Sequence, residues 1–277
     1  MDDEIETRIA TLLDGILAYR RHPFQRVKAP PNVVWSEGTT RLLLHGDGTG
    51  RPLLIVPSLI NRYYVLDIKP GRSLLEYLGQ AGFAPYVVDW GDLGEPEREF
   101  TPTDYIAGRL EDALDVILER TGARPGLVGY CMGGLLALAQ RRHADILSLV
   151  LMATPWDFSA DAGPGLEFFS AAKAALGGTI DVFGALPTDI TQAMFYASDP
   201  MLVVRKFLKF AEMDIKGAQA GAFVALEDWI NDGVPLAAAL LDSTQARVAL
   251  GHIGMVVSEA DRERAWKIMV DRLETKR

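Results

Sequence analysis

The chain has 277 residues, of which 49% are hydrophobic, and this is enough apolar material for one large domain or two small ones. The net charge of -9 disfavours nucleic acid as a general partner, because phosphate binding relies on clustered Lys and Arg. The first residues are acidic where a signal peptide would be basic, and no apolar run reaches the ~18 residues of a membrane span. With a single cysteine excluding an intramolecular disulfide, these features predict a cytoplasmic protein without a transmembrane segment.

The first part of the chain is predicted to form a hairpin followed by a buried strand. Residues Val33–Trp35 and Arg41–Leu44 are separated by a short turn and favour an antiparallel pair. The apolar run Leu53–Val56 follows as a buried strand. A helix is expected over Ser73–Gln80 and a further strand over Ala84–Asp89.

Strands and helices continue to alternate after this point. A helix is predicted over Thr103–Arg120, with Thr103 as its N-cap, and apolar strands over Gly126–Val128 and Ile146–Ala153. Good helix formers over Leu135–Ala139 stand between those two strands. This alternation predicts a mostly parallel sheet covered on both faces, and the preceding hairpin gives the order of the α/β-hydrolase fold.

The alternation breaks over residues 157–234, which are rich in Phe, Ala and Met. Leu202, Phe207 and Phe210 have helical spacing within this stretch. We expect one α/β-hydrolase domain over residues 1–277, with a helical cap inserted at about 157–234. The cap aromatics are interpreted as cap core in preference to substrate contacts.

The only cysteine lies at the centre of a G-x-C-x-G segment, Gly129–Gly133. A sharp strand-to-helix turn between glycines presents one side chain at an exposed position, as in the nucleophile elbow of α/β-hydrolases. The alternative is an inert buried thiol, which is the commoner fate of a free cysteine. The flanking glycines favour Cys131 as a nucleophile.

A nucleophilic thiol needs a base and an oxyanion site. Four histidines are available, and the chain order nucleophile, acid, histidine favours His252 in the late loop Gly251–Gly254 over the earlier ones, His22, His45 and His143. Imidazole beside the thiol lowers its pKa and transfers its proton. The backbone N–H groups of Met132 and Leu59 are the predicted oxyanion donors, with Ser58 as an ordinary turn residue being the alternative for the turn after the third strand.

These motifs resemble the polyhydroxyalkanoate synthases, particularly the class III enzymes that have two kinds of subunit. The resemblance runs collinearly from about Val33 to Asp232 and from Asp242 to Ser258, through the segments Leu53–Pro57, Asn61–Asp67, Arg72–Leu74, Val88–Gly91, the Cys131 elbow, Thr154–Phe158 and Gly251–Gly254. It implies transfer of 3-hydroxyacyl groups from coenzyme A thioesters to Cys131, with His252 as base, and then to a growing polyester. It also implies a polyester granule and a second synthase subunit or a homodimer as partners, and no metal or redox cofactor.

The sequence departs from this family where the catalytic acid is expected. Residues Gly233–Leu250 are too few for a strand, a crossover helix and a second strand, so the penultimate strand and its acid are predicted to be missing. Asp157 is the first substitute, and Asp232 and Asp242 are weaker ones. A Cys-His pair without an acid predicts slow acylation, since the acid orients the imidazole.

Two other functions stay open at this point. An esterase or thioesterase has the same fold but passes the acyl group to water. A non-catalytic, synthase-like subunit that pairs with an active partner or binds polyester granules is favoured by the missing acid and disfavoured by the intact elbow. Arg62 and Lys69 are local cations suited to small anionic substrates in spite of the net negative charge.

Overall fold

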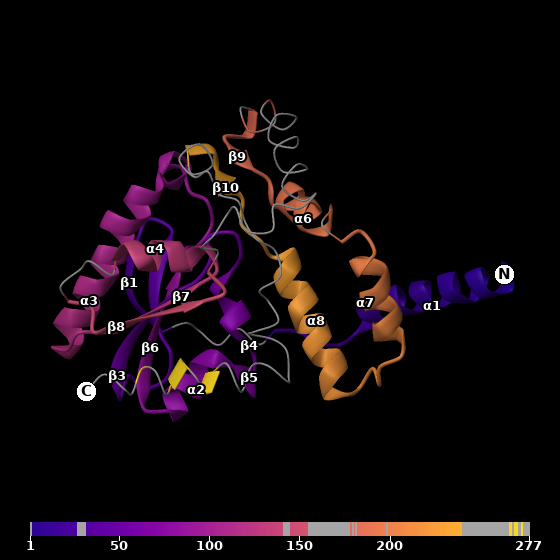
Figure 1. Cartoon of the computed structure of the whole chain (residues 1–277), viewed down its shortest axis with the longest axis horizontal. Helices are drawn as coiled ribbons and strands as arrows, with labels where there is room; N and C mark the ends of the chain where they lie inside the picture. The colour runs from indigo at the N-terminus through magenta and orange to yellow at the C-terminus, as the bar shows by residue number, and fades with distance from the viewer. Residues whose placement is uncertain are drawn as a thin grey trace.

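A single six-stranded sheet forms the centre of the computed structural model (Figure 1), with the strand order β1-β2-β6-β3-β7-β8. The structure describes residues 2–26, 32–140, 145–154, 178, 180, 182–197, 199–239, 266–267, 269–270 and 273. The sheet strands are β1 (Val33–Glu37), β2 (Thr40–Leu44), β3 (Arg51–Val56), β6 (Phe83–Asp89), β7 (Gly126–Tyr130) and β8 (Ser148–Met152). All six were expected from the sequence, with small shifts of their ends.

The sheet is antiparallel at one edge and parallel elsewhere. Strand β1 pairs antiparallel with β2, and β2 antiparallel with β6. Strand β3 runs parallel to both of its neighbours, β6 and β7, and β7 runs parallel to β8. Because parallel strands end at the same edge of a sheet, the loops that follow β3, β6 and β7 are brought together there.

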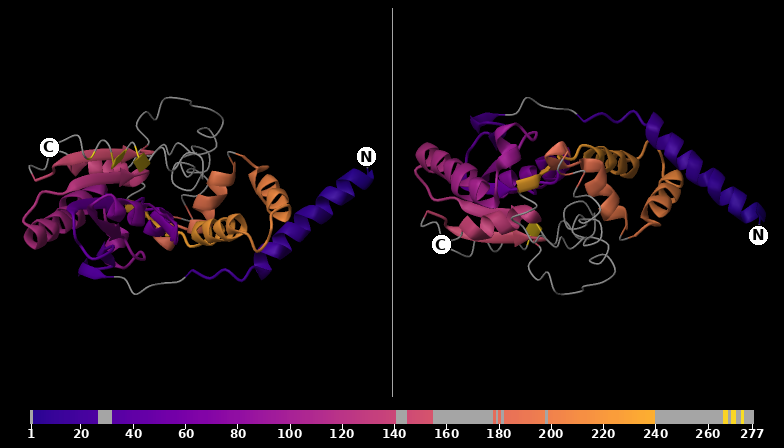
Figure 2. Two further views of the ribbon diagram at one scale, coloured as in Figure 1. Left: turned by 90° about the horizontal axis from the view of Figure 1, so that it is seen from below. Right: turned by 90° about the horizontal axis from the view of Figure 1, so that it is seen from above.

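Helices cover both faces of the sheet, as Figure 2 shows. One face packs against α3 (Glu111–Thr121) and α4 (Met132–Gln140) through Ala113, Leu114 and Leu136. The other face packs against α2 (Leu74–Gln80) and against Trp266, Met269 and Leu273 near the C-terminal end. The two apolar clusters explain why the central strands read as continuous apolar runs.

The start of the helix that leads to α3 differs from the expectation. Thr103 makes no side-chain capping bond and already has helical backbone angles, so its prediction as N-cap is wrong. The capping interaction belongs to Thr101, whose N–H donates to the Asp104 carboxylate at 2.7 Å. A π-helical segment, Asp104–Leu110, then precedes α3. In contrast, Ser73 caps α2 as expected and accepts the Glu76 N–H at 3.0 Å.

The region expected as a cap is helical where it is described. It contains α6 (Thr188–Ala197), α7 (Leu202–Ala211) and α8 (Ala218–Asn231). An antiparallel pair of short strands that the sequence did not predict, β9 (Ala185–Leu186) with β10 (Leu236–Ala237), brackets these helices. Phe207 and Phe210 of α7 are buried, which confirms that they belong to the cap core.

A long N-terminal helix, α1 (Asp2–Arg21), packs against α7 and extends beyond the body of the molecule (Figure 1). The pair approaches closely at Gly15, where a Cβ would overlap the carbonyl of Phe207. Two small strands, β4 (Asp67–Lys69) and β5 (Arg72–Ser73), and 3-10 turns at Tyr63–Leu66 and Pro96–Glu99 complete the described elements. Among the described helices, none has the length and apolar character needed to cross a membrane.

The predicted loss of the penultimate strand concerns residues 233–250, of which 240–250 lie outside the described part of the chain.

Candidate active site

Cys131 occupies a sharp turn between a strand and a helix. Strand β7 ends at Tyr130 and α4 begins at Met132, so that Cys131 alone joins them. Its φ angle is 54°, a left-handed value that is uncommon for residues other than glycine. Strained backbone of this kind gathers at functional sites, and the turn has the form of a nucleophile elbow. The expected elbow is therefore present in the structure.

Close packing explains the glycines around Cys131. A Cβ at Gly129 would lie 2.5 Å from the Cα of Gly134. A Cβ at Gly133 would overlap the carbonyl oxygens of Val56 and Pro57, and one at Gly134 would overlap the side chain of Thr154. The elbow helix thus sits directly against the end of β3, which only glycine allows.

The elbow is also tied to the neighbouring strand. The Cys131 N–H donates to the Met152 carbonyl at the end of β8, at 2.9 Å. The Gly134 N–H donates to the Cys131 carbonyl at 2.9 Å and starts the helical turn. Ala153, directly after β8, is the other described non-glycine residue with a positive φ, at 50°. Both strand ends are held in strained turns beside each other.

The thiol of Cys131 is largely enclosed and accepts hydrogen bonds from two groups. Burial raises the pKa of the Cys131 thiol, whereas hydrogen bonds from the Met132 N–H and the Ser58 side chain lower it. The Ile60 N–H donates to Ser58 Oγ at 3.3 Å, which leaves the Ser58 hydroxyl proton free to point at the sulfur. Because burial is the largest of these influences, ionisation at neutral pH calls for a further base or cation.

The loop after β3 is held at both ends by indole groups. Trp90 Nε1–H donates to the Pro57 carbonyl at 3.1 Å, and Trp229 Nε1–H of α8 donates to the Arg62 carbonyl at 2.8 Å. Between them, the Ile60 carbonyl accepts the Val234 N–H at 3.0 Å. The backbone that carries the predicted donor Leu59 is therefore fixed between the sheet and the cap.

Charged side chains surround the end of this loop. Arg62 forms an ion pair with Asp92, and its Nε lies 3.7 Å from the Asp232 carboxylate. Tyr64 donates its hydroxyl proton to the same Asp232. The carboxylates of Asp92 and Asp232 thus balance the Arg62 charge, so Arg62 is a weak receptor for an anionic substrate in this arrangement. The contacts with Arg62 and Tyr64 give Asp232 a structural role.

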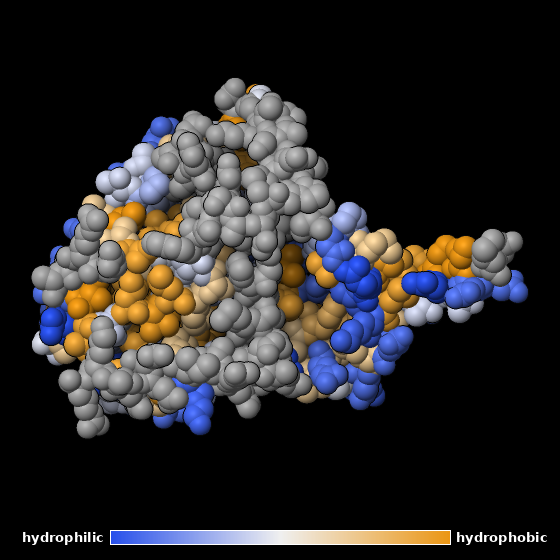
Figure 3. All heavy atoms as spheres, viewed as in Figure 1, coloured by the Kyte–Doolittle hydropathy of each residue, from blue (hydrophilic) through white to orange (hydrophobic). Residues whose placement is uncertain are grey.

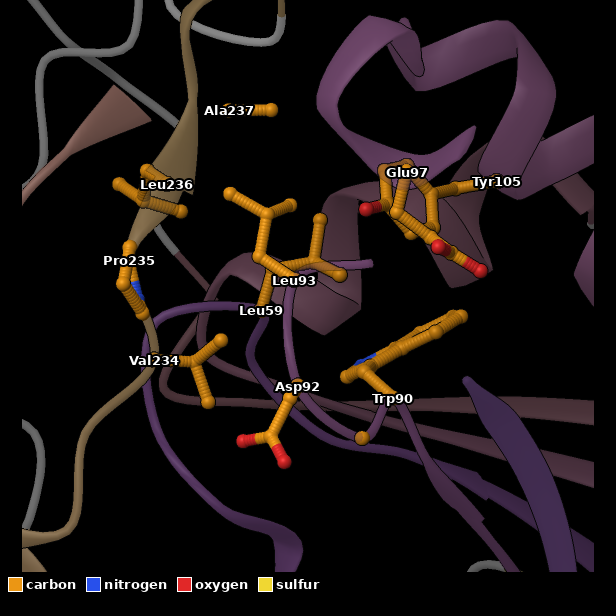
Figure 4. Close-up of a pocket in the computed structure, with 11 residues that line it drawn as sticks. Leu59, Trp90, Asp92, Leu93, Glu97, Tyr105, Val234, Pro235, Leu236 and Ala237 are labelled. Atoms are coloured by element: carbon orange, nitrogen blue, oxygen red, sulfur yellow. The ribbon is translucent and has the colours of Figure 1, made fainter. Parts of the chain in front are cut away.

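A pocket opens beside this loop (Figure 4). It is small and partly open to solvent. Leu59 and Leu93 lie between the Val234–Leu236 segment and the rings of Trp90 and Tyr105. Its other lining residues are Gly91, Asp92, Glu97 and Ala237. The walls are mostly apolar, and Met132 belongs to the same buried cluster as Leu59, Trp90 and Tyr105.

The structure brings together one part of the predicted site. Cys131, Met132 and Ser58 are in contact, and Leu59 follows directly in the chain. His252 and Asp157, with His143 and Asp242, lie outside the described residues, so the predicted base and acid stay predictions. His22 is occupied by backbone groups, since its Nδ1 accepts the Phe24 N–H and its Nε2 lies 3.0 Å from the Ile215 carbonyl.

Sequence reasoning missed two features of the site. The sequence placed the turn at Ser58 and Leu59 beside Cys131 as a source of a backbone N–H, but it did not predict the contact between the Ser58 hydroxyl and the thiol. The hydrogen bond from Trp229 to the loop after β3 crosses from the cap to the sheet, and no local sequence pattern predicts it.

Comparisons with known proteins agree with this geometry. Residues 42–275 match the model of a family described as alpha/beta hydrolase family. A "Poly(3-hydroxyalkanoate) polymerase subunit PhaC" of Haloferax mediterranei is 32% identical over 76% of this chain and 44% of its own length. The protein of the same name from Allochromatium vinosum is 29% identical over 74% of this chain and 60% of its own length. The chain thus spans about half the length of these curated relatives, and its resemblance to the polyhydroxyalkanoate synthases is confirmed.

A solved structure extends the agreement to the fold. The crystal structure of a lipase candidate from Sulfolobus solfataricus superposes with a TM-score of 0.54, covering 91% of this chain and 98% of the other at 12% identity. At that identity the likeness concerns the fold alone. The family match covers most of the chain, including the elbow and the sheet that carries it, and the chain therefore belongs to the alpha/beta hydrolase family.

Proposed function

We propose that this protein is an acyltransferase of the polyhydroxyalkanoate synthase type, and that Cys131 carries the acyl group. The observation that supports this most directly is the elbow itself. It places a thiol, in place of the hydroxyl of a lipase, at a strained position where it accepts hydrogen bonds from the Met132 N–H and Ser58. The curated relatives are named as poly(3-hydroxyalkanoate) polymerases, which makes a 3-hydroxyacyl thioester the substrate to test first.

In the proposed reaction the Cys131 thiolate attacks the carbonyl carbon of a 3-hydroxyacyl coenzyme A. A carbon–sulfur bond forms to Cys131, the bond to the coenzyme A sulfur breaks, and the leaving thiolate takes up a proton from the base, for which His252 is proposed. The hydroxyl of another 3-hydroxyacyl group then attacks the acyl-enzyme. It gives its proton to the base, forms an ester and releases Cys131.

A thiol suits this sequence because the entering and enzyme-bound acyl groups are both thioesters of similar energy. Negative charge on the carbonyl oxygen would be received by the N–H groups of Met132 and Leu59. The apolar pocket that begins at Leu59 is proposed to hold the alkyl part of the substrate. The reaction as written needs no metal or redox cofactor.

The experiment is the intact mass of the full chain after incubation with 3-hydroxybutyryl coenzyme A, with released coenzyme A and polymer quantified. We expect an adduct that is absent in Cys131→Ala, together with ester-linked oligomers. An adduct that only hydrolyses would assign a thioesterase instead. Folded protein that neither forms an adduct nor releases coenzyme A would overturn the proposal and favour a non-catalytic subunit.

A further inference from the structure

A tyrosine hydroxyl lies on the wall of the pocket beside Leu59. The side chain of Tyr105 is buried, and its ring extends toward Leu93, so that the hydroxyl oxygen lies at the pocket wall (Figure 4). Within the described part of the chain, no residue forms a hydrogen bond with this oxygen. Because a buried tyrosine hydroxyl usually has a hydrogen-bond partner, a ligand in the pocket is the group that would supply one.

Packing fixes the position of this hydroxyl. The Tyr105 ring meets the rings of Trp90 and Phe100 edge to face, at centroid distances of 5.3 and 5.4 Å. The π-helical segment that carries Tyr105 is tied to the elbow helix α4, because the buried Gln140 side chain donates to the Ile106 carbonyl. Short π-helical segments are frequent at functional sites. The hydroxyl is therefore held at one place relative to the helix that follows the nucleophile.

The Tyr105 hydroxyl is a hydrogen-bond donor at neutral pH. Burial and the neighbouring Glu97 carboxylate raise the pKa of Tyr105 to about 12. The Glu97 carboxylate is itself fixed, since its Oε1 accepts the Thr39 N–H at 3.0 Å and lies 3.9 Å from Arg109 Nη2. The phenol therefore keeps its proton and can donate a hydrogen bond to an oxygen in the pocket.

The pocket begins next to the nucleophile. Leu59, on its wall, directly follows Ser58, whose hydroxyl donates to the Cys131 thiol. Hydrophilic side chains cover α7 in Figure 3, whereas apolar ones lie over α8, which is nearer the sheet. The segment that leaves α8 supplies another wall with the apolar residues Val234–Leu236 (Figure 4). An acyl group on Cys131 whose carbonyl oxygen is held by the Leu59 N–H would extend into this pocket.

The Tyr105 hydroxyl distinguishes two kinds of acyl group. An unsubstituted alkyl chain would cover the hydroxyl and leave it without a partner, which costs free energy. A chain that carries an oxygen beyond its carbonyl supplies an acceptor and avoids this cost. Sites that form a hydrogen bond with a polar atom of the substrate reject the analogue that lacks this atom.

We propose that Tyr105 makes the site specific for oxygenated acyl groups, by donating a hydrogen bond to the 3-oxygen of a 3-hydroxyacyl thioester. The inference rests on the proposed acyl transfer at Cys131, and it names the residue that selects the substrate. Tyr105 contacts the bound chain and takes no part in the bond changes at the carbonyl, so its role is specificity and not catalysis.

Binding to the Cys131→Ala chain, measured by calorimetry, tests this selection without any chemistry. We expect 3-hydroxybutyryl coenzyme A to bind about tenfold more tightly than butyryl coenzyme A. Tyr105→Phe in the same chain is expected to remove this preference by weakening the 3-hydroxybutyryl complex alone. Tyr77→Phe is the matched control, since Tyr77 packs on the other face of the sheet and does not line the pocket.

Three results of this titration overturn the proposal. They are a preference that stays tenfold in Tyr105→Phe, equal weakening of both complexes by that substitution, and a Cys131→Ala chain that shows no preference or binds neither thioester. Equal weakening is the result expected of a residue with only a structural role.

Acylation of the natural chain separates this inference from the proposed function. Intact mass gives the rate at which each thioester acylates Cys131. A tenfold binding preference that depends on Tyr105, without an acyl adduct, would support the selection and refute acyl transfer. Acylation by both thioesters at equal rates, in the natural chain and in Tyr105→Phe, would support acyl transfer and refute the selection.

Discussion

The hydroxyl of Ser58 forms a hydrogen bond with the thiol of Cys131 at the elbow. Burial raises the pKa of the Cys131 thiol, and the hydrogen bond from Ser58 is one of two contacts that act in the opposite direction. Because the Ile60 N–H orients Ser58 Oγ, the effect of Ser58 on the thiol pKa depends on the conformation of the loop after β3. The ionised fraction of Cys131 thus depends on a residue that is not part of the elbow.

Ser58→Ala is predicted to raise the pKa of Cys131 further, because a hydrogen bond to the thiolate is lost while burial remains. Below that pKa the thiolate fraction falls, so alkylation by iodoacetamide at neutral pH slows about tenfold, and its pH profile moves to higher pH. Ser58→Thr retains a hydroxyl and serves as the control. An unchanged profile in Ser58→Ala would show that the contact does not influence the thiol.

Gly133→Ala is predicted to destabilise the protein by about 1–3 kcal/mol, because the added methyl overlaps the backbone carbonyls of Val56 and Pro57. The control is Gly79→Ala in α2, where nothing lies within 4 Å of the added Cβ. There we expect a gain of about 0.4–1 kcal/mol from reduced chain entropy. Thermal denaturation of both variants measures the difference, and equal melting temperatures would contradict the packing described for the elbow.

The elbow could be predicted from the sequence because its causes are local. Glycines on both sides of Cys131, an apolar run before it and helix formers after it all lie within a few residues. The meeting of the elbow with the turn after β3 was expected, and β3 and β7 are neighbours in the sheet. The bond from the Ser58 hydroxyl to the thiol could not be predicted, since it depends on how the Ser58 side chain is oriented by the Ile60 N–H.

At the scale of elements, the loop from Pro57 to Arg62 is the point where sheet and cap are joined. The sheet holds it through Trp90, and α8 holds it through Trp229. The isolated bridge between Asn61 and Gly233 lies in the same place. Motion of α8 relative to the sheet would therefore act first on the backbone next to Leu59.

Trp229→Phe is predicted to lower the free energy of unfolding by about 1–3 kcal/mol, because the Arg62 carbonyl loses its buried donor. Acylation of Cys131 by a thioester should slow as well, since the Leu59 backbone is then less firmly placed. Trp35→Phe on the edge strand β1 is the matched control, and we expect it to leave acylation unchanged. Equal acylation rates in Trp229→Phe and the natural chain would refute the role assigned to this bond.

Element prediction from the sequence succeeded for the sheet and was weaker at helix starts. Buried strands produce apolar runs that are hard to mistake, so all six were found. The N-cap was misplaced at Thr103, because Thr101 and Thr103 are both suitable residues and only the position of the Asp104 side chain decides between them.

Across the whole molecule, stability is expected to be distributed unevenly. Strands β3, β6 and β7 are buried and form the middle of the sheet, whereas residues 3–10 of α1 are exposed on all sides. We predict that amide hydrogen exchange is slowest in those three strands and fastest in the first half of α1. Protection in the first half of α1 that equals the protection of those strands would contradict this pattern.

The features that sequence reasoning missed at this scale are the ones that join distant segments. The aliphatic residues of α1 repeat with helical spacing, so the helix itself was open to prediction, but its packing on α7 was not. The antiparallel pair of β9 and β10 joins residues about fifty positions apart, and each strand has only two residues. Such short strands leave no periodic signal.

The two indoles that hold the loop after β3 also make the intrinsic tryptophan fluorescence of the protein sensitive to the position of that loop. Trp90 and Trp229 are two of the five tryptophans in the chain, and each donates its N–H to a carbonyl at one end of that loop. Indole emission responds to the loss or lengthening of such a bond, so displacement of the loop changes the colour and intensity of the natural fluorescence. Binding of a colourless thioester can thus be followed in unlabelled protein, with Trp90→Phe and Trp229→Phe separating the signal from the sheet side and the signal from the cap side.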